Sequence, residues 1–545
     1  MTVTYNSQPV FKDLSWDIHN DRCVGLVGAN GSGKSTLLRV IAGELKSESG
    51  FANSRGQISI GNLHQEPRLD PHKTVLEEAL TASTQIPELE RRLALVEAQM
   101  GDPAVYSDEK KLSRKVEEHA RLLDEYTQVG GPGYEGQIRA TLLNLGFSEA
   151  ELDLPVTVLS GGQKKLVGLT KLLVTRPNLL LLDEPDNHLD MAGKAFLEKY
   201  IRNYPGGVVI VSHDRYLLDL VADEIAELED GRLNVYSGNY SEYAFDKEQR
   251  LHQQQHQFQV QQKEIDRLEF SAKRMLIWGR SHDNEKLIRR AKSMMKRIER
   301  MDKVERPIME RKTMGLQLSG WRGSNKVLDI AGLRKAFPAA GGSEQAEILR
   351  GIDLTLWHGE RVGLVGPNGA GKSLIFRHIL GQEEADAGET KLGPSIKLGY
   401  YSQEHESLDY EANLIDTVRG AAALSEGGAV NLLGRFLFTY EQARGPIKNL
   451  SGGERSRLQM ALITLSGANF LLLDEPTNNL DIRSAEVLET ALDEFEGSVL
   501  VISHDRYFLD RVATRIVELE DGQATEYPGA YSDYQAAKER LSLAI

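Results

Sequence analysis

The sequence contains one cysteine in 545 residues and no apolar run long enough to cross a membrane. A single thiol, Cys23, excludes an internal disulfide and any metal site made of several cysteines, and such usage is typical of a reducing compartment. A membrane-spanning helix needs about 20 predominantly apolar residues, and the first residues lack the basic and then apolar pattern of a signal peptide. These absences predict a soluble, cytoplasmic protein without a membrane partner.

The chain also lacks an excess of positive charge. The chain has 65 Lys and Arg against 80 Asp and Glu, a net charge of −15, which argues against a general coat for nucleic acid but leaves room for a local basic patch. With 40% hydrophobic and 27% charged residues, the composition is that of a folded globular protein and excludes disorder throughout. The length favours three or four compact units of about 150 residues each.

What the sequence does contain is an internal repeat. The segment GLVGANGSGKS at 25–35 returns as GLVGPNGAGKS at 363–373, an offset of 338 residues. Three later segments, LSGG, LLLDEP and SHDRY, return with an offset of 291 residues. The difference of 47 residues predicts an insertion in the first copy between Gln65 and Ser160, and dense charge at helical spacing favours a helical arm at about 84–135. The chain therefore has two homologous halves.

The segment that joins the halves has a different character. Ser241–Trp278 contains no Gly or Pro, Gly279 interrupts it, and Arg280–Arg306 is again free of both. This pattern predicts two long helices that fold back on each other near Trp278–Asn284. We expect a first domain at 1–241, a basic helical hairpin linker at 242–325 and a second domain at 326–545.

Each half has a glycine-rich loop of the form G-x-x-x-x-G-K-S, at Gly28–Ser35 and Gly366–Ser373, between a predicted strand and a predicted helix. Glycines let the backbone N–H groups point at phosphate oxygens, and the helix N-terminus adds positive potential. The loop lysine is expected to neutralise the β- and γ-phosphates of ATP, and the serine after it to bind Mg²⁺. These residues are Lys34, Ser35, Lys372 and Ser373.

A short apolar run ends in an acidic pair in each half, as a buried parallel strand would. The aspartate is expected to hold Mg²⁺, and the glutamate to orient or deprotonate the attacking water. A histidine after the next apolar run is placed to polarise the γ-phosphate, although a lone histidine there is more often structural. In chain order, these residues are Asp183, Glu184, His213, Asp474, Glu475 and His504.

With LSGGQ at 159–163 and LSGGE at 450–454, these motifs resemble those of the ATP-binding cassette superfamily. Two cassettes in one chain, an arm in the first and a charged helical linker are similar to its F subfamily over nearly the whole length. The resemblance implies an α/β fold of two P-loop ATP-binding cassette domains in tandem, with a helical arm inserted in the first and a long α-helical hairpin linker between them. It also implies a Mg²⁺-dependent ATP hydrolase, in a monomer whose cassettes close head-to-tail over two ATP molecules.

The resemblance implies two composite ATP sites in the closed form. Site one would consist of Lys34, Ser35, Gln65, Asp183, Glu184 and His213 with Ser451 and Gly453 from the other cassette. Site two would consist of Lys372, Ser373, Gln403, Asp474, Glu475 and His504 with Ser160 and Gly162. In each site the glutamine is expected to be a further Mg²⁺ ligand, and the serine and backbone N–H groups of LSGG can donate to the γ-phosphate.

Aromatic residues before the glycine loops are candidates to stack on the adenine base. Tyr5 and Phe337 stand at suitable spacings, although an aromatic at a strand end is often a core residue. The other residues expected to bind ATP belong to the loops, the following helix turns and the LSGG segments. They are Gly28, Asn30, Gly31, Gly33, Thr36, Gly366, Asn368, Gly369, Gly371, Leu374, Ser160, Gly161, Gly162, Gln163, Ser451, Gly452, Gly453 and Glu454.

The two copies differ after the catalytic glutamate. Asp186 stands in the first half where Thr477 stands in the second, and this places an extra carboxylate near one interface. No catalytic acid is missing, so we expect both sites to be competent, while the difference leaves their relative rates open.

The linker carries the local basic patch. Residues 271–300 contain ten Lys and Arg against three Asp and Glu, which is the electrostatic footprint of a nucleic-acid backbone contact. Trp278 at the turn is a candidate to stack on a base, although a charged hairpin can simply be solvated. The predicted RNA-binding residues are Lys273, Arg274, Trp278, Arg280, Lys286, Arg289, Arg290, Lys292, Lys296 and Arg297.

The same resemblance implies that the ATPase acts on the ribosome, and that the linker contacts ribosomal RNA and tRNA. The first functional hypothesis is therefore a translation factor that binds the ribosome in its ATP-bound form and regulates translation through hydrolysis. A second is antibiotic resistance by protection of the ribosome. A third is the ATPase module of a transporter or a DNA-repair ATPase, but a transporter module would lack the basic linker and a zinc-bearing repair ATPase would need more cysteines.

Overall fold

The computed structural model describes residues 1–5, 8–53, 56, 58–63, 67, 69–282, 284–301, 314–338, 345–403 and 408–544. The chain divides into two units, which are described separately: residues 240–313, and residues 1–239 together with 314–545. The larger unit holds both homologous halves, here called the first half (1–239) and the second half (314–545).

The first half is built on a six-stranded sheet with the order β4-β5-β6-β3-β7-β8. All neighbouring strands run parallel except β7 and β8, which pair antiparallel. The strands are β3 (Cys23–Val27), β4 (Ile60–Leu63), β5 (Leu179–Asp183), β6 (Gly207–Val211), β7 (Glu224–Glu229) and β8 (Arg232–Ser237). Every residue of β3, β5 and β6 is buried, which explains why these strands read as unbroken apolar runs rather than alternating ones.

The second half repeats this sheet in the order β13-β14-β15-β11-β16-β17, again with one antiparallel pair at the edge. The strands are β11 (Arg361–Val365), β13 (Leu398–Tyr401), β14 (Phe470–Asp474), β15 (Ser498–Ile502), β16 (Arg515–Glu520) and β17 (Gln523–Pro528). Identical strand order in both halves is the structural counterpart of the sequence repeat.

A smaller antiparallel sheet accompanies each large one. In the first half it has two strands, β1 (Val3–Tyr5) and β2 (Gln8–Phe11). In the second half it has three, in the order β10-β9-β12, over Gln345–Trp357, Lys326–Pro338 and Ala387–Leu392.

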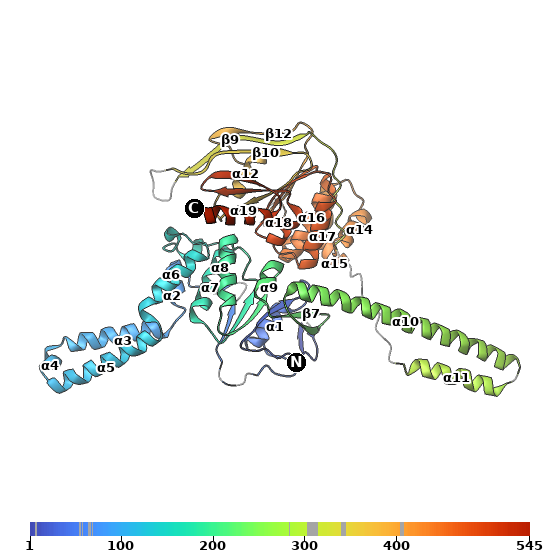
Figure 1. Ribbon diagram of the computed structural model, residues 1–545, viewed down its shortest axis with the longest axis horizontal. Helices are drawn as coiled ribbons and strands as arrows, with labels where there is room; N and C mark the ends of the chain where they lie inside the picture. Colours follow the sequence, from blue (N-terminus) through green and yellow to red (C-terminus); the bar gives the residue numbers. More distant parts are fainter. Residues whose placement is uncertain are drawn as a thin grey trace. The chain divides into compact units, whose positions relative to one another are not determined.

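The helices of the first half include the inserted arm, in which α3 and α5 lie side by side (Figure 1). The arm has a small core of Leu89, Leu93, Val96 and Leu122. The helices are α1 (Lys34–Ile41), α2 (Val75–Leu80), α3 (Gln85–Met100), α4 (Pro103–Tyr106), α5 (Glu109–Gln128), α6 (Tyr134–Asn144), α7 (Gly161–Thr175), α8 (Met191–Arg202) and α9 (Arg215–Val221).

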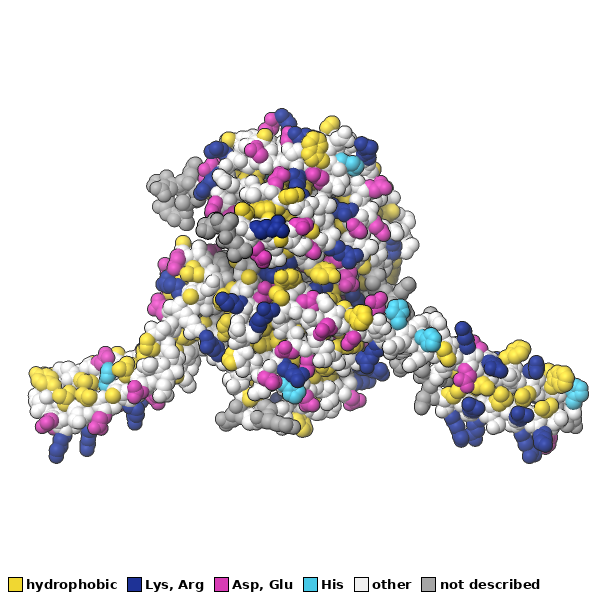
Figure 2. Space-filling view, in the orientation of Figure 1, with side chains coloured by type: hydrophobic (Ala, Val, Ile, Leu, Met, Phe, Trp, Pro, Cys, Tyr) yellow, Lys and Arg dark blue, Asp and Glu magenta, His cyan; other side chains and the backbone are white. Residues whose placement is uncertain are grey.

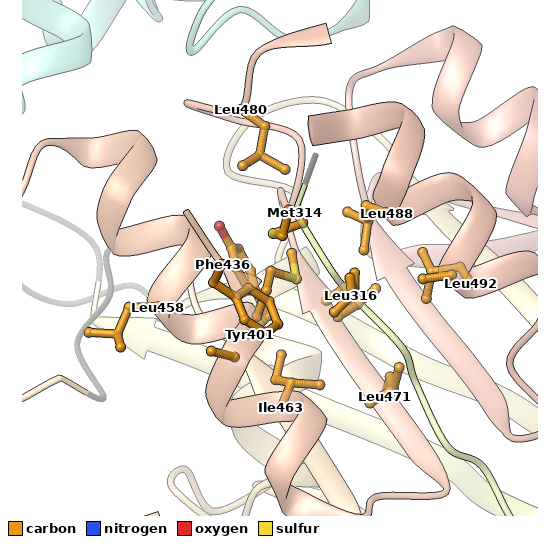
Figure 3. Packing of buried hydrophobic residues seen from close by; sticks show 14 of the residues in the cluster. Met314, Leu316, Tyr401, Phe436, Leu458, Ile463, Leu471, Leu480, Leu488 and Leu492 are labelled. Carbon is orange, nitrogen blue, oxygen red and sulfur yellow. The ribbon is translucent and has the colours of Figure 1, made fainter. Parts of the chain in front are cut away.

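One core cluster of the second half lies between the large sheet and its helices (Figure 3). Met314 and Leu316, from the stretch that precedes the first strand of this half, pack in the core with Leu471 and Phe436. The helices are α12 (Lys372–Ile379), α13 (Leu414–Ala421), α14 (Glu426–Arg435), α15 (Tyr440–Arg444), α16 (Gly452–Ser466), α17 (Ile482–Asp493), α18 (Arg506–Val512) and α19 (Tyr531–Ala544).

The unit of residues 240–313 contains the two predicted helices, but their bounds differ from the prediction. Helix α10 (Tyr240–Ser281) runs through Gly279, since one glycine in a helix costs only about 1 kcal/mol relative to alanine. Helix α11 (Glu285–Glu299) begins at a cap in which the side chain of Asn284 accepts from the backbone N–H of Leu287, and it ends seven residues before the predicted Arg306, which lies outside the described residues. The predicted hairpin is confirmed: α10 ends at Ser281 and α11 begins at Glu285, so the turn lies within the predicted Trp278–Asn284, although Gly279 itself does not end α10.

Alanines allow the two linker helices to approach closely. Ala272 of α10 and Ala291 of α11 are fully buried, and Ile265 and Ile298 are nearly so. Within the described ranges, no helix combines the length and the apolar character needed to cross a membrane.

Candidate functional site

Both glycine-rich loops connect a buried strand to a helix that begins at the loop lysine, β3 to α1 and β11 to α12. The residue before each lysine, Gly33 or Gly371, has a φ of 103° or 96°, a left-handed conformation that favours glycine. A side chain at Gly28 would place its Cβ 2.5 Å from the carbonyl oxygen of Leu228. The loops therefore require glycine for their shape and for their close approach to the sheet.

The loop lysines are buried and turn back onto their own loops. The Lys34 ammonium donates to the carbonyl oxygens of Gly28 and Ala29 at 2.8 and 3.1 Å. Lys372 does the same with Gly366 and Pro367 at 2.7 and 2.8 Å. Burial lowers the pKa of both lysines, against the opposing effect of nearby carboxylates.

The aspartate at the end of β5 or β14 meets the serine of the adjacent glycine loop. Burial raises the pKa of Asp183 and outweighs a hydrogen bond from Ser35 that lowers it. Burial likewise raises the pKa of Asp474 to about 6 against a hydrogen bond from Ser373. One buried carboxylate oxygen of each aspartate has no hydrogen-bond partner in the part of the chain that the structure describes. Serine hydroxyl and carboxylate oxygens are hard ligands, so these residues fit Mg²⁺.

The glutamate after each aspartate has a left-handed backbone conformation, with a φ of 50° at Glu184 and 49° at Glu475. Its backbone N–H donates to the end of the next strand, to Val211 in the first half and to Ile502 in the second. The side-chain oxygen Oε1 lies 3.6 Å from the histidine Nε2 in both halves, His213 and His504 respectively. The structure thus brings the predicted base and the predicted histidine together twice.

The two glutamates have opposite pKa shifts. Burial alone would raise the pKa of Glu184, but His213, Lys165 and Lys34 outweigh it and lower the pKa to about 2. Burial raises the pKa of Glu475 to about 8, with a further increase from Asp474 and only partial compensation by Lys372.

The LSGG segments form the N-terminal caps of α7 and α16. The Ser160 hydroxyl accepts from the backbone N–H of Gln163 at 3.2 Å, while the Gln163 side chain accepts from the Ser160 N–H. Ser451 and Glu454 form the same capping box. A capping box fixes the first helical turn and its exposed N–H groups.

A cavity of about 760 Å³ lies between the two halves at the second glycine loop. Phe337, which is 39% exposed, and Leu374 contribute to its wall. It is also lined by all eight residues expected in site two. These are Lys372, Ser373, Gln403, Asp474, Glu475, His504, Ser160 and Gly162.

The corresponding residues of site one are partly described. A side chain at Gly453 of the second half would place its Cβ 2.9 Å from the Asn30 Nδ2 atom of the first glycine loop, so these segments face each other. Gln65 lies outside the described residues. Tyr5 lies in β1, but its side chain is not among the described ones.

Each glycine loop also contacts the loop after the opposite glutamate, a contact that the sequence did not predict. The backbone N–H of Asn30 donates to Asp481 at 3.3 Å, and its side chain donates to the carbonyl oxygen of Asn479 at 3.0 Å. In the mirror position, Asn368 donates to Asp190 and to the carbonyl oxygen of His188, both at 3.2 Å. The 291-residue offset relates the acceptors of the two contacts, but nothing in the sequence indicates that they meet the opposite glycine loop.

Two crossed ion pairs join the halves near the SHDRY segments. Arg215 pairs with Glu489 on α17, and Arg506 pairs with Glu198 on α8 at 2.9 Å. Each arginine also lies over a tyrosine ring of the other half, at 3.9 Å for Arg215 and 4.6 Å for Arg506. Both arginines are buried, and the two sets of contacts are related by the repeat.

The described side chains of the predicted RNA-binding set lie in the separate unit of α10 and α11. Trp278 is 64% exposed and its ring lies 5.6 Å from that of His282. All nine basic residues of the set are exposed, and Figure 2 shows Lys and Arg side chains gathered along this hairpin. Lys273 and Arg289 form ion pairs with glutamates one helical turn away.

The duplicated sheet, loops and acidic strand ends define a protein with two ATP-binding cassettes. The sequence profile of the family described as "ABC transporter" matches residues 11–187 and 349–478, and a second profile with the same description matches 226–317. The chain belongs to the F family of ATP-binding cassette proteins, which are tandem ATPases with two cassettes in one chain. The predicted family and fold class are confirmed.

Several relatives are similar over the full length. The chain is 36% identical to the energy-dependent translational throttle protein EttA of Escherichia coli K12, over 97% of this chain and 93% of that one. It is also 36% identical to the putative ATP-binding protein YdiF of Bacillus subtilis, over 100% and 83%, and 33% identical to ABC transporter F family member 5 of Arabidopsis thaliana, over 97% and 76%. A crystal structure of the archaeal ribosome recycling factor aABCE1 with a ribosomal stalk protein has a TM-score of 0.61 at 19% identity, covering 98% of this chain and 92% of that one, and supports the fold.

Proposed function

We propose that this protein is a Mg²⁺-dependent ATPase with two composite sites, and that it binds the ribosome in its closed, ATP-bound form to regulate translation. The observation that carries the proposal is the cavity in which Lys372 and Glu475 of one cassette lie opposite Ser160 and Gly162 of the other. The EttA relative, whose name describes an energy-dependent translational throttle, supports translation as the process.

The residues of each cassette have distinct roles in this proposal. Lys34 and Lys372 leave their loop carbonyls to contact the β- and γ-phosphates, while the glycine-loop N–H groups hold the phosphate chain. Mg²⁺, when bound between Ser35 and Asp183 or between Ser373 and Asp474, supplies positive charge to the phosphate oxygens.

The glutamates and histidines act on the water and the γ-phosphate. Glu184 or Glu475 accepts a proton from the attacking water, and His213 or His504 holds the glutamate and faces the γ-phosphate. Ser160 and Ser451, with the N–H groups of their helix caps, donate to the γ-phosphate from the opposite cassette. Because groups from both cassettes contact each γ-phosphate, ATP favours closure of the interface, and hydrolysis breaks that link and lets the cassettes separate.

The double variant E184Q/E475Q tests this cycle. Glutamine keeps the shape and the hydrogen bonding but removes the base, so ATP should drive closure without hydrolysis. We expect the variant with ATP to co-sediment with ribosomes, to slow cell growth and to arrest protein synthesis, whereas K34A/K372A should do none of these. Release of the double glutamine variant as fast as the parent would contradict a cycle driven by hydrolysis.

The RNA interaction of the linker has its own test. Reversal of four exposed charges in K286E/R289E/R290E/K292E should weaken binding of the ATP-locked protein to ribosomes. The slope of log affinity against log salt should shrink by about 0.7–0.9 for every phosphate that the variant no longer neutralises. The variant K286R/R289K/R290K/K292R keeps every charge and is the matched control. An unchanged slope in the reversed variant would indicate a solvated hairpin.

A further inference from the structure

Lys194 is a buried cation that breaks the symmetry of the interface between the cassettes. It lies on α8 of the first cassette and is 8% exposed. The 291-residue offset places Ala485 at the same position in the second cassette, and Asp186 beside it corresponds to Thr477. The crossed arginine pairs and the asparagine contacts occur in both directions, but an alanine side chain cannot supply an ammonium group.

The Lys194 ammonium joins the two cassettes at site two. It donates to the Asp214 carboxylate of its own cassette at 2.8 Å and to the backbone carbonyl oxygen of His504, in the other cassette, at 2.8 Å. Asp214 is itself held in place, because it caps α9 by accepting from the Leu217 N–H at 3.0 Å. The ammonium therefore ties the His504 backbone to a fixed element of the opposite cassette.

The His504 backbone is in turn the support of the predicted base. Its N–H donates to a carboxylate oxygen of Glu475 at 3.2 Å. Lys194 thus holds the carbonyl group of His504, and Glu475 holds the N–H group of the same residue. A shift of His504 would displace both the imidazole and the glutamate from their positions.

We propose that Lys194 is a positioning residue that acts from the first cassette on the hydrolytic glutamate and histidine of site two, with no equivalent for site one. This inference rests on the proposed hydrolysis at site two. Lys194 makes hydrolysis at that site depend on the closed interface, because its bond to His504 forms only when the cassettes meet.

The charges around Lys194 agree with this role. Burial lowers the pKa of Lys194, but the carboxylates of Asp214, Asp186 and Asp505 outweigh it, so the pKa is raised and the side chain stays charged. A charged donor in a buried site makes a stronger hydrogen bond to a carbonyl than a neutral one.

The test measures the first turnover of phosphate release at each site separately, in full-length protein at saturating Mg²⁺ and ATP. The E184Q background reports site two and the E475Q background reports site one. K194M keeps the length of the side chain but removes the donor, K194R restores a charged donor, and K199A is a matched control on an exposed position of the same helix.

We expect K194M to slow hydrolysis about tenfold to hundredfold in the E184Q background, because small displacements of reacting groups have costs of that size. The half-saturating ATP concentration should change less than about twofold, and K194R should recover a substantial part of the rate. In the E475Q background, K194M should stay within about twofold of its parent.

Three results would overturn the proposal: an unchanged rate in the E184Q background, an equal loss in both backgrounds, or a loss that K194R does not reduce. If K194M does not fold because Asp214 is left unpaired, K194M/D214N removes that charge and is measured in its place against D214N. The proposed function fails separately, if E184Q itself releases no more phosphate than E184Q/E475Q.

Discussion

Site one and site two place their glutamates on the same left-handed turn, each with a histidine nitrogen 3.6 Å away. The charges around these turns nevertheless differ, because the first cassette carries three charged residues where the second has small neutral ones. They are Lys165, Asp186 and Lys194, opposite Ser456, Thr477 and Ala485. The comparison shows that the two cassettes keep the same backbone at the two sites. Charged residues of the first cassette make the two sites different from each other.

Two lysines act on different sites. Lys165 donates to the carbonyl oxygen of Glu184 at 2.7 Å and stabilises the negative charge in site one from the same cassette. Lys194 reaches site two from the opposite cassette. Burial dominates at Glu475 and raises its pKa to about 8. His213 lowers the pKa of Glu184 most, followed by Lys165, and serine stands at the position equivalent to Lys165 in the second cassette.

The largest effect is expected from removing the glycine-loop lysine that each of the two sites contains. K34A and K372A each delete an ammonium group that stabilises the transferring phosphate in a buried site, where the removal of one such group typically reduces the rate by about 10²–10³. The double variant should therefore show no measurable Mg²⁺-dependent ATP hydrolysis in a phosphate-release assay. K110A, on the exposed face of the arm, should behave as the parent. Parent-like rates in the double variant would refute the assignment of both sites.

The second prediction separates the sites by pH. A general base must be deprotonated, so site two, measured in E184Q, should lose up to about tenfold in rate per pH unit as the pH falls below 8. Site one, measured in E475Q, should have a flat profile from pH 6 to pH 9, because the pKa of Glu184 is lowered to about 2. If the pH–rate profiles of the two variants coincide, the two glutamates titrate alike, and the proposed electrostatic difference between the sites is refuted.

The third prediction makes site one resemble site two. K165S places the second cassette's residue beside Glu184 and removes a charge that lowers its pKa. Because His213 and Lys34 still lower the pKa of Glu184, the loss of rate on the acidic side should begin at a higher pH than in the E475Q parent, while the rate at pH 8 stays unchanged. S456K, the reciprocal change, should reduce the loss at low pH in the E184Q background. No change in either profile would assign Lys165 a purely structural role.

The smallest expected effect concerns stability in chelator without nucleotide. The folded pKa of Glu475 is above its unfolded value, so its ionisation opposes folding increasingly as the pH rises from about 4.5 through 8. Glu184 is the reverse case, and its stabilisation is present above about 4.5 and lost only as the pH falls towards 2. The unfolding temperature of E475Q relative to the parent should therefore rise by a few degrees between pH 5 and pH 8. The difference for E184Q should stay constant over that range.

Much of the fold followed from local sequence. The repeat offsets predicted two equivalent halves, and the unbroken apolar runs predicted the central parallel strands, since both patterns depend on residues close in the chain. The end of the first linker helix was not predictable from Gly279, because neighbouring helix-forming residues outweigh the modest cost of one glycine.

The candidate site was predictable where the chemistry lies in short motifs. Lys372, Glu475 and His504 come together because parallel strands end at one edge of a sheet. Lys194 was missed, since its partner is a backbone carbonyl 310 residues away and a carbonyl has no signature in the sequence. Only the comparison of Lys194 with Ala485 across the repeat indicated an asymmetry.

The crossed pairs between Arg215 and Glu489 and between Arg506 and Glu198 also have a genetic consequence. Each half of the gene encodes one partner of both pairs, so a charge change in one half can be corrected only in the other. A suppressor screen that starts from R215E should recover basic residues at position 489. The two halves of the gene are therefore constrained to change together at these four positions.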